Sequence, residues 1–420
     1  MARGIFRIRG GRQLHGEISV SGSKNTALPA IAAALLTREP VILENVPNIA
    51  DVGVMIEIAG SLGAKINWDG AGHRLTIEAK ELAATLDDKL ARKLRGSFLF
   101  SGSLIGRLRS ASLSYPGGDK IGARPLTTHL NALRGLGVAI GESERLNLNG
   151  ANLAGARITL EEPSVTATEN TILAAVLAPG VTEIHLADQS PHVQELTSML
   201  RAMGANLQWT DVGVVRIEGR ERLHGTQFRI NPDEMEISGF AALAAATRSV
   251  IVIRGINACY LDSVLLQLSK MGVGHHLSGA DLFIEKPRSP YKGFRLQSGL
   301  YPKLMSDHLP PFAVLATQAA GESLIHEWMY ESRLGYIEEL KKMGANARVL
   351  DSHRAIIVGP TPLRGGQIAG LDIRSGLTLV IAGLVAEGET TITEIDQIDR
   401  GYERIDERLR SLGADIERVA

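Results

Sequence analysis

The sequence contains little cysteine, no surplus of charge of one sign and no long apolar run. Its 420 residues include one cysteine, Cys259, which excludes an internal disulfide and any metal site built from several cysteines. A single thiol suits the reducing cytoplasm, where we expect this chain to act. The 45 basic and 46 acidic side chains leave a formal net charge of −1, so no basic surplus indicates a nucleic acid or an acidic membrane surface as partner.

Other absences narrow the function further. The most apolar stretches, such as residues 27–36 and 377–386, are too short to span a bilayer. The first ten residues lack the continuous apolar segment of a signal peptide. The eleven histidines are scattered except for His275 and His276, which as neighbours cannot face the same side of a regular element. We therefore expect no metal, no cofactor, no nucleic acid partner and no membrane association.

What the sequence does contain is an internal repeat. A helical pattern that ends in Leu or Met, followed by Gly and then Ala or Val, occurs six times, and the glycines are 74, 67, 68, 72 and 69 residues apart. This pattern predicts a helix closed by a left-handed glycine and followed directly by a strand. The glycines are Gly63, Gly137, Gly204, Gly272, Gly344 and Gly413.

Two further glycine patterns follow the same period. Gly16, Gly155, Gly225, Gly293 and Gly365 each stand two residues after Leu or Tyr, where a strand is expected to start, and one copy is missing between the first two. Gly180, Gly321 and Gly388 end short turns before alternating strands. A period of about 70 residues is longer than the repeat of an ordinary solenoid. The six mixed α/β units are therefore expected to form two domains of three units each.

Cationic side chains stand at several predicted helix starts and loops. Lys24 follows a strand and the turn Ser21–Ser23, an arrangement that can bind an anion but also suits a solvated lysine. Residues 115–125 contain three glycines and two prolines together with Asp119 and Arg124, which suits either a lid or a plain surface turn. Other charged side chains also stand at predicted helix starts or in loops, where helix capping or surface ion pairing is the simpler explanation of each. They are Asp307, Arg333, Arg374 and Arg400.

Five segments together resemble the enolpyruvyl transferase family. They are SGSKNTALP from Ser21, PGGDKIGARP from Pro116, SVTATEN from Ser164, DIRSG from Asp372 and IDRGYERIDERLRSLGA from Ile398. They are spread over the whole chain in the family's order, so the match is specific although each string is short.

The resemblance implies a two-domain, inside-out α/β barrel built from six βαβαββ repeats, with a pseudo-threefold axis in each domain. It implies that residues 1–21 and 232–420 form one domain, completed by the N-terminal strand. Residues 22–231 form the other, which carries a mobile loop around residues 112–124.

The resemblance also implies the reaction. The enolpyruvyl group of phosphoenolpyruvate is transferred to the 3′-hydroxyl of UDP-N-acetylglucosamine with release of phosphate, the first committed step of peptidoglycan synthesis. A substrate with a phosphate and a carboxylate requires several fixed cations, and a carboxylate must take the proton of the acceptor hydroxyl. By its match to the family, the chain is expected to have the catalytic residues Asp119, Asp307, Lys24 and Arg400. The residues expected to contact phosphoenolpyruvate are Lys24, Arg124, Arg400, Arg95, Arg333 and Arg374. The residues expected to contact the acceptor are Asn25, Arg95, His129, Ser164, Val165, Thr166 and Asp307.

One residue departs from the family pattern on the phosphoenolpyruvate side. Many members carry a cysteine where this chain has Asp119. A carboxyl group can still donate a proton, but it offers no thiolate for an epoxide inhibitor to alkylate. We expect the protein to be insensitive to fosfomycin.

Further departures concern the acceptor side. Ser190-Pro191-His192 stands where members commonly have Glu-Pro-Glu, and Ser332 replaces a common Asn. An enolpyruvyl transferase for another UDP-sugar or nucleotide is therefore one alternative; the shikimate-pathway branch is disfavoured because its Gly-Asn-Ala-Gly-Thr string is absent. A non-catalytic UDP-sugar-binding protein is another alternative, although a binder would not need both Asp119 and Asp307.

Overall fold

A computed structural model describes residues 4–119 and 121–419 of the chain. It divides the chain into two compact units. The terminal unit consists of the described residues of Met1–Ser21, Lys120–Ala123 and Pro232–Ala420. The middle unit consists of Gly22–Asp119 and Arg124–Asn231. Each unit has its own hydrophobic core.

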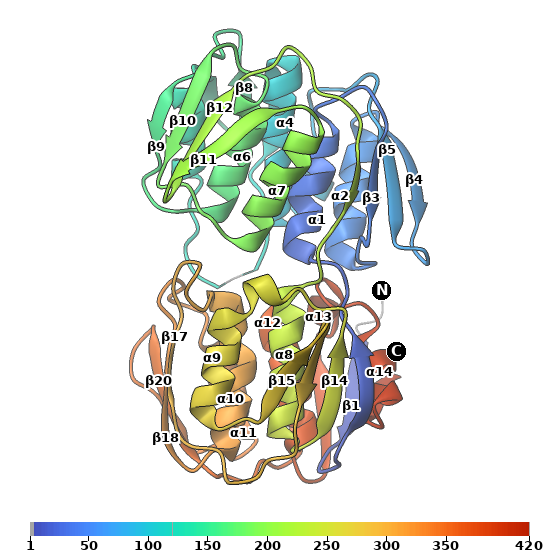
Figure 1. The fold of residues 1–420 in the computed structure, drawn as a ribbon, viewed down its shortest axis with the longest axis vertical. Helices are drawn as coiled ribbons and strands as arrows, with labels where there is room; N and C mark the ends of the chain where they lie inside the picture. Colours follow the sequence, from blue (N-terminus) through green and yellow to red (C-terminus); the bar gives the residue numbers. More distant parts are fainter. Residues whose placement is uncertain (1–3, 120, 420) are drawn as a thin grey trace. The chain divides into compact units, whose positions relative to one another are not determined.

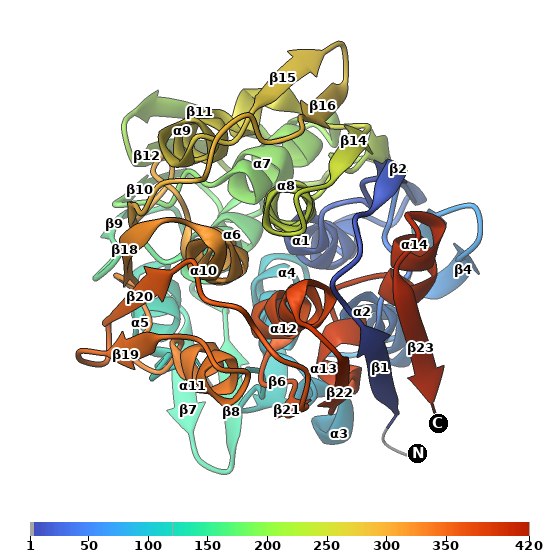
Figure 2. The same cartoon turned by 90° about the horizontal axis from the view of Figure 1, so that it is seen from below.

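Each unit places helices inside and sheets outside (Figure 1). Three helices pack against one another at the centre of the terminal unit, which Figure 2 shows from below with the sheets around them. All thirteen residues of the central helix Glu234–Ala246 are buried, because its alanine-rich sequence presents small apolar side chains on every face. This is the inside-out α/β architecture that the family resemblance implies, and the fold prediction is confirmed.

The elements of the middle unit are as follows. Its central helices are α1 (Lys24–Ala34), α4 (Leu99–Leu108) and α6 (Val165–Ala175). Its other helices are α2 (Ala50–Ser61), α3 (Asp88–Ala91), the 3₁₀ helix η1 (Arg95–Phe98), α5 (Thr127–Gly135) and α7 (Pro191–Ala202). One sheet has the strand order β13 (Gln227–Arg229), β3 (Val41–Glu44), β5 (Arg74–Glu78), β4 (Lys65–Asp69). A second sheet has the order β6 (Ser110–Ser114), β8 (Arg145–Asn149), β7 (Ala139–Glu142). A third sheet has the order β11 (Asn206–Asp211), β12 (Val214–Glu218), β10 (Val181–His185), β9 (Arg157–Thr159).

The terminal unit repeats this plan. Its central helices are α8 (Glu234–Ala246), α10 (Leu309–Gln318) and α12 (Ile373–Val385). Its other helices are η2 (Ala258–Tyr260), α9 (Asp262–Met271), η3 (Ser306–His308), α11 (Gly335–Lys342), α13 (Asp396–Asp399) and α14 (Ile405–Ser411). One sheet has the strand order β21 (Gln367–Ala369), β22 (Glu389–Thr393), β1 (Ile5–Arg9), β23 (Asp415–Val419). A second sheet has the order β15 (His275–Ser278), β16 (Asp281–Ile284), β14 (Val250–Arg254), β2 (His15–Ser19). A third sheet has the order β17 (Arg295–Gln297), β18 (Gly321–His326), β20 (Arg354–Gly359), β19 (Ala347–Val349).

The first glycine pattern marks helix ends, as predicted. All six of its glycines have φ between 82° and 106°, a conformation that a Cβ atom disfavours. The glycines of the turn pattern, Gly180, Gly321 and Gly388, also have positive φ, at 96°, 101° and 89°. The repeat read from the sequence is therefore a repeat of backbone conformation.

Close approach of neighbouring backbone explains four of the five strand-start glycines, whereas Gly16 has a positive φ of 110°. A Cβ atom on Gly365 would lie 2.2 Å from the carbonyl oxygen of Glu389, and one on Gly293 would lie 2.4 Å from that of Glu322. The missing copy belongs to the three-stranded sheet of the middle unit. There an isolated parallel bridge between Thr85 and Ser112 replaces the fourth strand.

The N-terminal residues complete sheets of the terminal unit. β1 pairs antiparallel with β22 and β23, and β2 pairs parallel with β14. The division into units differs from the predicted boundaries in the loop, because residues 121–123 group with the terminal unit. The predicted loop also starts later than expected, since residues 112–114 belong to β6.

Within the described residues, no helix is both long and apolar enough to cross a membrane.

Candidate functional site

In the terminal unit, Asp307 lies between two buried arginines. η3 carries Asp307 immediately before the central helix α10. Its Oδ1 is 2.6 Å from Nη2 of Arg333, and its Oδ2 is 3.1 Å from Nε of Arg374. Both arginine side chains are 3% exposed, whereas that of Asp307 is 27% exposed. The carboxylate is thus the accessible member of a buried ionic cluster.

Neighbouring groups hold both guanidinium groups in place. Arg333 lies over the ring of Tyr330 and donates a hydrogen bond to Oγ of Ser306 (2.7 Å). Arg374 lies over the ring of Tyr402 and donates to its hydroxyl (3.0 Å). Among the described residues, Nε of Arg333 and Nη2 of Arg374 have no hydrogen-bond partner. Each guanidinium therefore keeps an unused donor, which suits the binding of a further anion.

The two arginines control the protonation of Asp307. Burial by itself would raise the pKa of this carboxyl, but the positive charges of Arg333 and Arg374 and their hydrogen bonds hold the pKa far below its usual range. In this state Asp307 is a weak base.

Arg400 is connected to this cluster through the chain. It follows α13 and donates a hydrogen bond to Gln397 (2.9 Å). Tyr402, which binds Arg374, is two residues further on. The terminal unit thus brings Asp307, Arg333 and Arg374 into direct contact and places Arg400 on the adjoining segment.

In the middle unit, Lys24 begins the central helix α1. Ser23 caps this helix by accepting a hydrogen bond from the backbone N–H of Thr26 (3.4 Å). Nζ of Lys24 is 3.3 Å from Oδ2 of Asp51, and the two side chains are 13% and 6% exposed. Asn25 is half-buried. Lys24 is therefore a held cation rather than a solvated one, and the sequence patterns did not identify Asp51 as its partner.

Arg95 fixes the end of the glycine-rich loop. It donates hydrogen bonds to the carbonyl oxygens of Arg124 (2.6 Å) and Pro125 (3.2 Å). The Arg124 guanidinium in turn donates to the carbonyl oxygen of Asp119. The middle unit therefore links Arg95, Arg124 and Asp119, and the side chain of Asp119 is half-buried.

His129 and Thr166 form a second polar pair near Arg95. Nε2 of His129 is 2.8 Å from Oγ1 of Thr166. Burial, together with the positive charge of Arg95, lowers the pKa of His129 to about 3, so the ring is neutral at physiological pH. Ser164 caps α6, whose first residue is Val165. The predicted acceptor residues 164–166 thus lie at a helix N-terminus, where backbone N–H groups favour anions.

Residues 121–123 of the loop, which group with the terminal unit, bond to two other residues of that unit. The backbone N–H of Ala123 donates to Oε1 of Glu331 (2.6 Å), and that of Ser332 donates to the carbonyl oxygen of Ile121 (3.1 Å). Residues 331–334 form a turn, and α11 starts at Gly335. The sequence indicated a loop but carried no signal for its docking partner.

The segment that departs from the family on the acceptor side is buried. The backbone N–H of Ser190 donates to Oδ1 of Asp188 (2.7 Å), and His192 is 5% exposed. Glu169 is fully shielded, and its Oε1 has no hydrogen-bond partner among the described residues. Burial raises the pKa of Glu169 to about 8, with a smaller opposing effect from His192 and a small further increase from Asp188.

No group of three or more histidine, cysteine, aspartate or glutamate side chains in the described part of the chain is arranged to hold a metal ion.

Known proteins are similar to this chain over almost its whole length. The profile of the family described as EPSP synthase (3-phosphoshikimate 1-carboxyvinyltransferase) matches residues 8–409. The chain is similar to UDP-N-acetylglucosamine 1-carboxyvinyltransferase of Bradyrhizobium diazoefficiens, with 42% identity over 99% of this chain and 98% of the relative. It is similar to the protein of the same name from Treponema denticola, with 41% identity over 98% of each chain.

Solved structures show the same fold. The enolpyruvyl transferase NikO from Streptomyces tendae superposes with a TM-score of 0.91 at 25% identity and covers 99% of both chains. EPSP synthase from Acinetobacter baumannii superposes with a TM-score of 0.76 at 21% identity, covering 99% of this chain and 100% of the other, which bears on the fold alone.

Proposed function

The chain belongs to the EPSP synthase family, and from this premise we propose that it is a transferase that moves the enolpyruvyl group of phosphoenolpyruvate onto the 3′-hydroxyl of UDP-N-acetylglucosamine. The reaction releases phosphate and is the first committed step of peptidoglycan synthesis. The relatives that share about two fifths of its sequence over nearly the whole chain carry the name of this activity.

The observation that carries the proposal is the cluster of Asp307, Arg333 and Arg374. Two buried guanidinium groups share one accessible carboxylate, and they retain donors that it does not use. A phosphate or carboxylate of phosphoenolpyruvate binds such donors more strongly than a neutral ligand does. Substrate binding then removes the partners that hold down the pKa of Asp307.

This exchange prepares the carboxylate for its step. Once the substrate neutralises Arg333 and Arg374, the pKa of Asp307 rises towards its ordinary range. Asp307 then accepts the proton of the acceptor hydroxyl while the hydroxyl oxygen bonds to C2 of phosphoenolpyruvate. Asp119 donates a proton to C3, which completes the tetrahedral adduct. A base then takes a proton from C3, the electrons of that C–H bond form the C2=C3 double bond, and the C2–O bond breaks so that its electrons leave with phosphate.

We assign the remaining substrate contacts residue by residue. In the middle unit, Lys24, Arg95 and Arg124 bind phosphoenolpyruvate; in the terminal unit, Arg400 does so with Arg333 and Arg374. The acceptor contacts Asn25, Arg95, His129, Asp307 and residues 164–166. The neutral ring of His129 supports this assignment, because it can hydrogen-bond a sugar or a nucleotide without adding charge.

The reaction needs no cofactor, because phosphoenolpyruvate supplies both the transferred group and the leaving group. We further propose that the protein acts in the cytoplasm on these two small molecules, without nucleic acid or membrane, and serves cell-wall formation, cell shape and division. Because Asp119 offers no thiol, we also propose that fosfomycin does not inactivate it.

Phosphate release tests the function directly. Purified protein is incubated with phosphoenolpyruvate, with and without UDP-N-acetylglucosamine, and phosphate is measured. We expect release only with the acceptor, and a loss of at least about 100-fold in Asp307→Ala, because a positioned base contributes on this order. The control is Asp351→Ala, which removes an exposed aspartate that pairs with Arg354; it should keep full activity. Acceptor-independent release or an active Asp307→Ala variant would contradict the mechanism.

A second candidate is the same reaction on another UDP-sugar or nucleotide. The buried Ser190 and His192 favour it, since they replace the usual glutamates of the acceptor side. Activity with a panel of UDP-sugars and nucleotides separates the two candidates. Binding of a UDP-sugar without phosphate release from any acceptor would instead support the non-catalytic alternative.

A further inference from the structure

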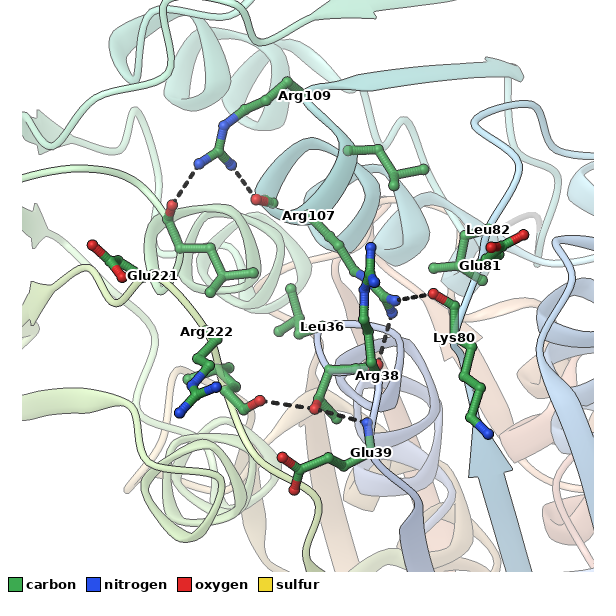
Figure 3. Close-up of a pocket in the computed structure, with 15 residues that line it drawn as sticks. Leu36, Arg38, Glu39, Lys80, Glu81, Leu82, Arg107, Arg109, Glu221 and Arg222 are labelled. Atoms are coloured by element: carbon green, nitrogen blue, oxygen red, sulfur yellow. Dashed lines mark hydrogen bonds between the residues drawn. The ribbon is translucent and has the colours of Figure 1, made fainter.

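The middle unit contains a pocket that the proposed reaction does not use. It has a volume of about 640 Å³ and lies at the carboxyl ends of the central helices α1, α4 and α6 (Figure 3). Lys24 and Ser164 stand at the opposite, amino ends of α1 and α6. Because each of these helices has eleven residues, the pocket is roughly 16 Å of helix away from those residues.

Basic side chains outnumber acidic ones in the pocket lining. The floor is apolar and is formed by the buried Leu36, Leu177 and Leu223. Five cationic side chains line the walls, against three glutamates. The cationic residues are Arg38, Lys80, Arg107, Arg109 and Arg222.

Two of the arginines are fixed by backbone carbonyl groups. Arg107 donates to the carbonyl oxygens of Leu35 and Thr37, both at 2.7 Å, and to those of Ala79 and Lys80. Arg109 donates to the carbonyl oxygens of Ile105, Gly106 and Leu177. Several of these carbonyl groups lie at the ends of helices, and within the described part of the chain neither arginine forms an ion pair with a carboxylate.

The other two arginines are exposed at the rim. Across the described residues, neither Arg38 nor Arg222 has a carboxylate within ion-pair distance, and neither side chain donates a hydrogen bond. Arg38 faces the fixed Arg107, and the two like charges repel each other (Figure 3). Two guanidinium groups in such proximity form a favourable site for an anion that lies between them.

The acidic side chains do not neutralise this site. Glu39 accepts hydrogen bonds from Gly225 (2.9 Å) and pairs with His224 (3.3 Å). The carboxylates of Glu81 and Glu221 lie on opposite sides of the pocket, away from Arg38 and Arg107 (Figure 3). The surplus positive charge is therefore greatest at Arg38 and Arg107, while Arg222 adds a cation at another wall and interacts electrostatically with Glu39.

We propose that this pocket binds a small phosphorylated molecule. Its phosphate would bind the exposed Arg38, where the fixed charge of Arg107 adds to the attraction, its apolar part would lie against the leucine floor, and Arg222 would contact the ligand from another wall. The volume lies within the usual range of small-molecule pockets, and the combination of fixed and exposed arginines suits a ligand with clustered negative charge.

The test uses inorganic pyrophosphate as the probe and isothermal titration calorimetry at constant ionic strength. The full chain should bind it, and Arg38→Ala/Arg222→Ala should weaken one class of site about tenfold or more, because two charge-assisted contacts are lost. The matched control is Arg157→Ala, which removes an exposed arginine of β9 outside the pocket; it should bind as the unaltered protein does.

A further variant separates this pocket from the proposed substrate site. Arg124→Ala, in the loop, should keep the binding that Arg38→Ala/Arg222→Ala loses, and the pocket variant should keep acceptor-dependent phosphate release. Equal affinity in the pocket variant and the control would overturn the proposal, as would loss of all pyrophosphate binding in Arg124→Ala. The function proposed above would survive either of these two results.

Discussion

Asp307 combines two properties that conflict in the unliganded protein. It is the accessible carboxylate of its cluster, yet Arg333 and Arg374 hold its pKa far below the usual range. A base so strongly paired cannot take a proton from a hydroxyl at neutral pH. The proposed mechanism therefore requires phosphoenolpyruvate to compete for the two arginines, which would tie proton transfer to the presence of this substrate.

Asp119 leads to a prediction about covalent inhibition. Fosfomycin should cause no time-dependent loss of activity in the protein, because a carboxylate does not replace a thiolate as nucleophile towards the epoxide. Asp119→Cys should remain active and become inactivated with time, with a mass increase at residue 119. The exposed Cys259 serves as internal control, and adduct formation in the unaltered protein would contradict the prediction.

Glu169 should make the stability depend on pH. Burial raises its pKa from 4.5 to about 8 in the folded protein. Between these pH values the unfolded chain releases a proton that the folded protein keeps, so the free energy of unfolding falls as the pH rises from 4.5 to 8.

Glu169→Gln should remove this contribution. Between pH 5 and pH 8, the variant should lose roughly 3 kcal/mol less stability than the unaltered protein. Urea denaturation at the two pH values measures the difference. Glu144→Gln, at an exposed position of the same unit, should leave the pH dependence unchanged; the same result for Glu169→Gln would show that the buried carboxyl does not retain its proton.

Among the helices, α14 is held to α8 by a buried ion pair. Arg408 donates to both carboxylate oxygens of Glu236, at 2.7 and 2.8 Å, and to the carbonyl oxygen of Ser19. Glu236 also accepts the backbone N–H of Ser21 (2.9 Å). The pair thereby fixes residues 19–21, the segment through which the chain leaves the terminal unit after β2.

Removing one partner of this pair should be costly. Arg408→Met leaves the carboxylate of Glu236 buried without its counterion and should lower the free energy of unfolding by about 3 kcal/mol. Urea denaturation measures the loss. Glu236→Gln/Arg408→Met should recover part of it, and Arg348→Met, at an exposed position of β19, should cost little. An effect of Arg408→Met as small as that of this control would mean that the pair is dispensable.

At the scale of the whole chain, the two units have separate hydrophobic cores. Leu104 in α4 and Leu315 in α10 are both fully buried, one in each core. Replacing either with alanine should cost about 3 kcal/mol, since it removes packed methyl groups and leaves a cavity.

The loss should be confined to the unit that carries the change. Hydrogen exchange followed by mass spectrometry reads protection in peptides of each unit separately. Leu104→Ala should lower protection in the middle unit and Leu315→Ala in the terminal unit. Equal loss in both units from either variant would show that the chain unfolds as one cooperative block.

The sequence by itself determined the features that depend on local backbone conformation. The six helix-ending glycines were found without any family, because only glycine adopts φ near 90° without strain. Their period predicted two groups of three units, and the family strings then indicated the fold and the reaction. The family resemblance also pointed to Asp307, Arg333 and Arg374, of which only Arg374 lies in a quoted string, and the structure brings these three residues into contact.

Only the tertiary structure decided which groups meet. Asp51 beside Lys24, Tyr402 beside Arg374 and Glu331 at the loop tip carry no sequence signal as partners. Ala123 and Glu331 are 208 residues apart in the chain, and such contacts depend on how sheets and helices pack rather than on local propensity. The pKa of Asp307 depends on its distances from Arg333 and Arg374, because electrostatic interactions are set by the separation and burial of the charges in space.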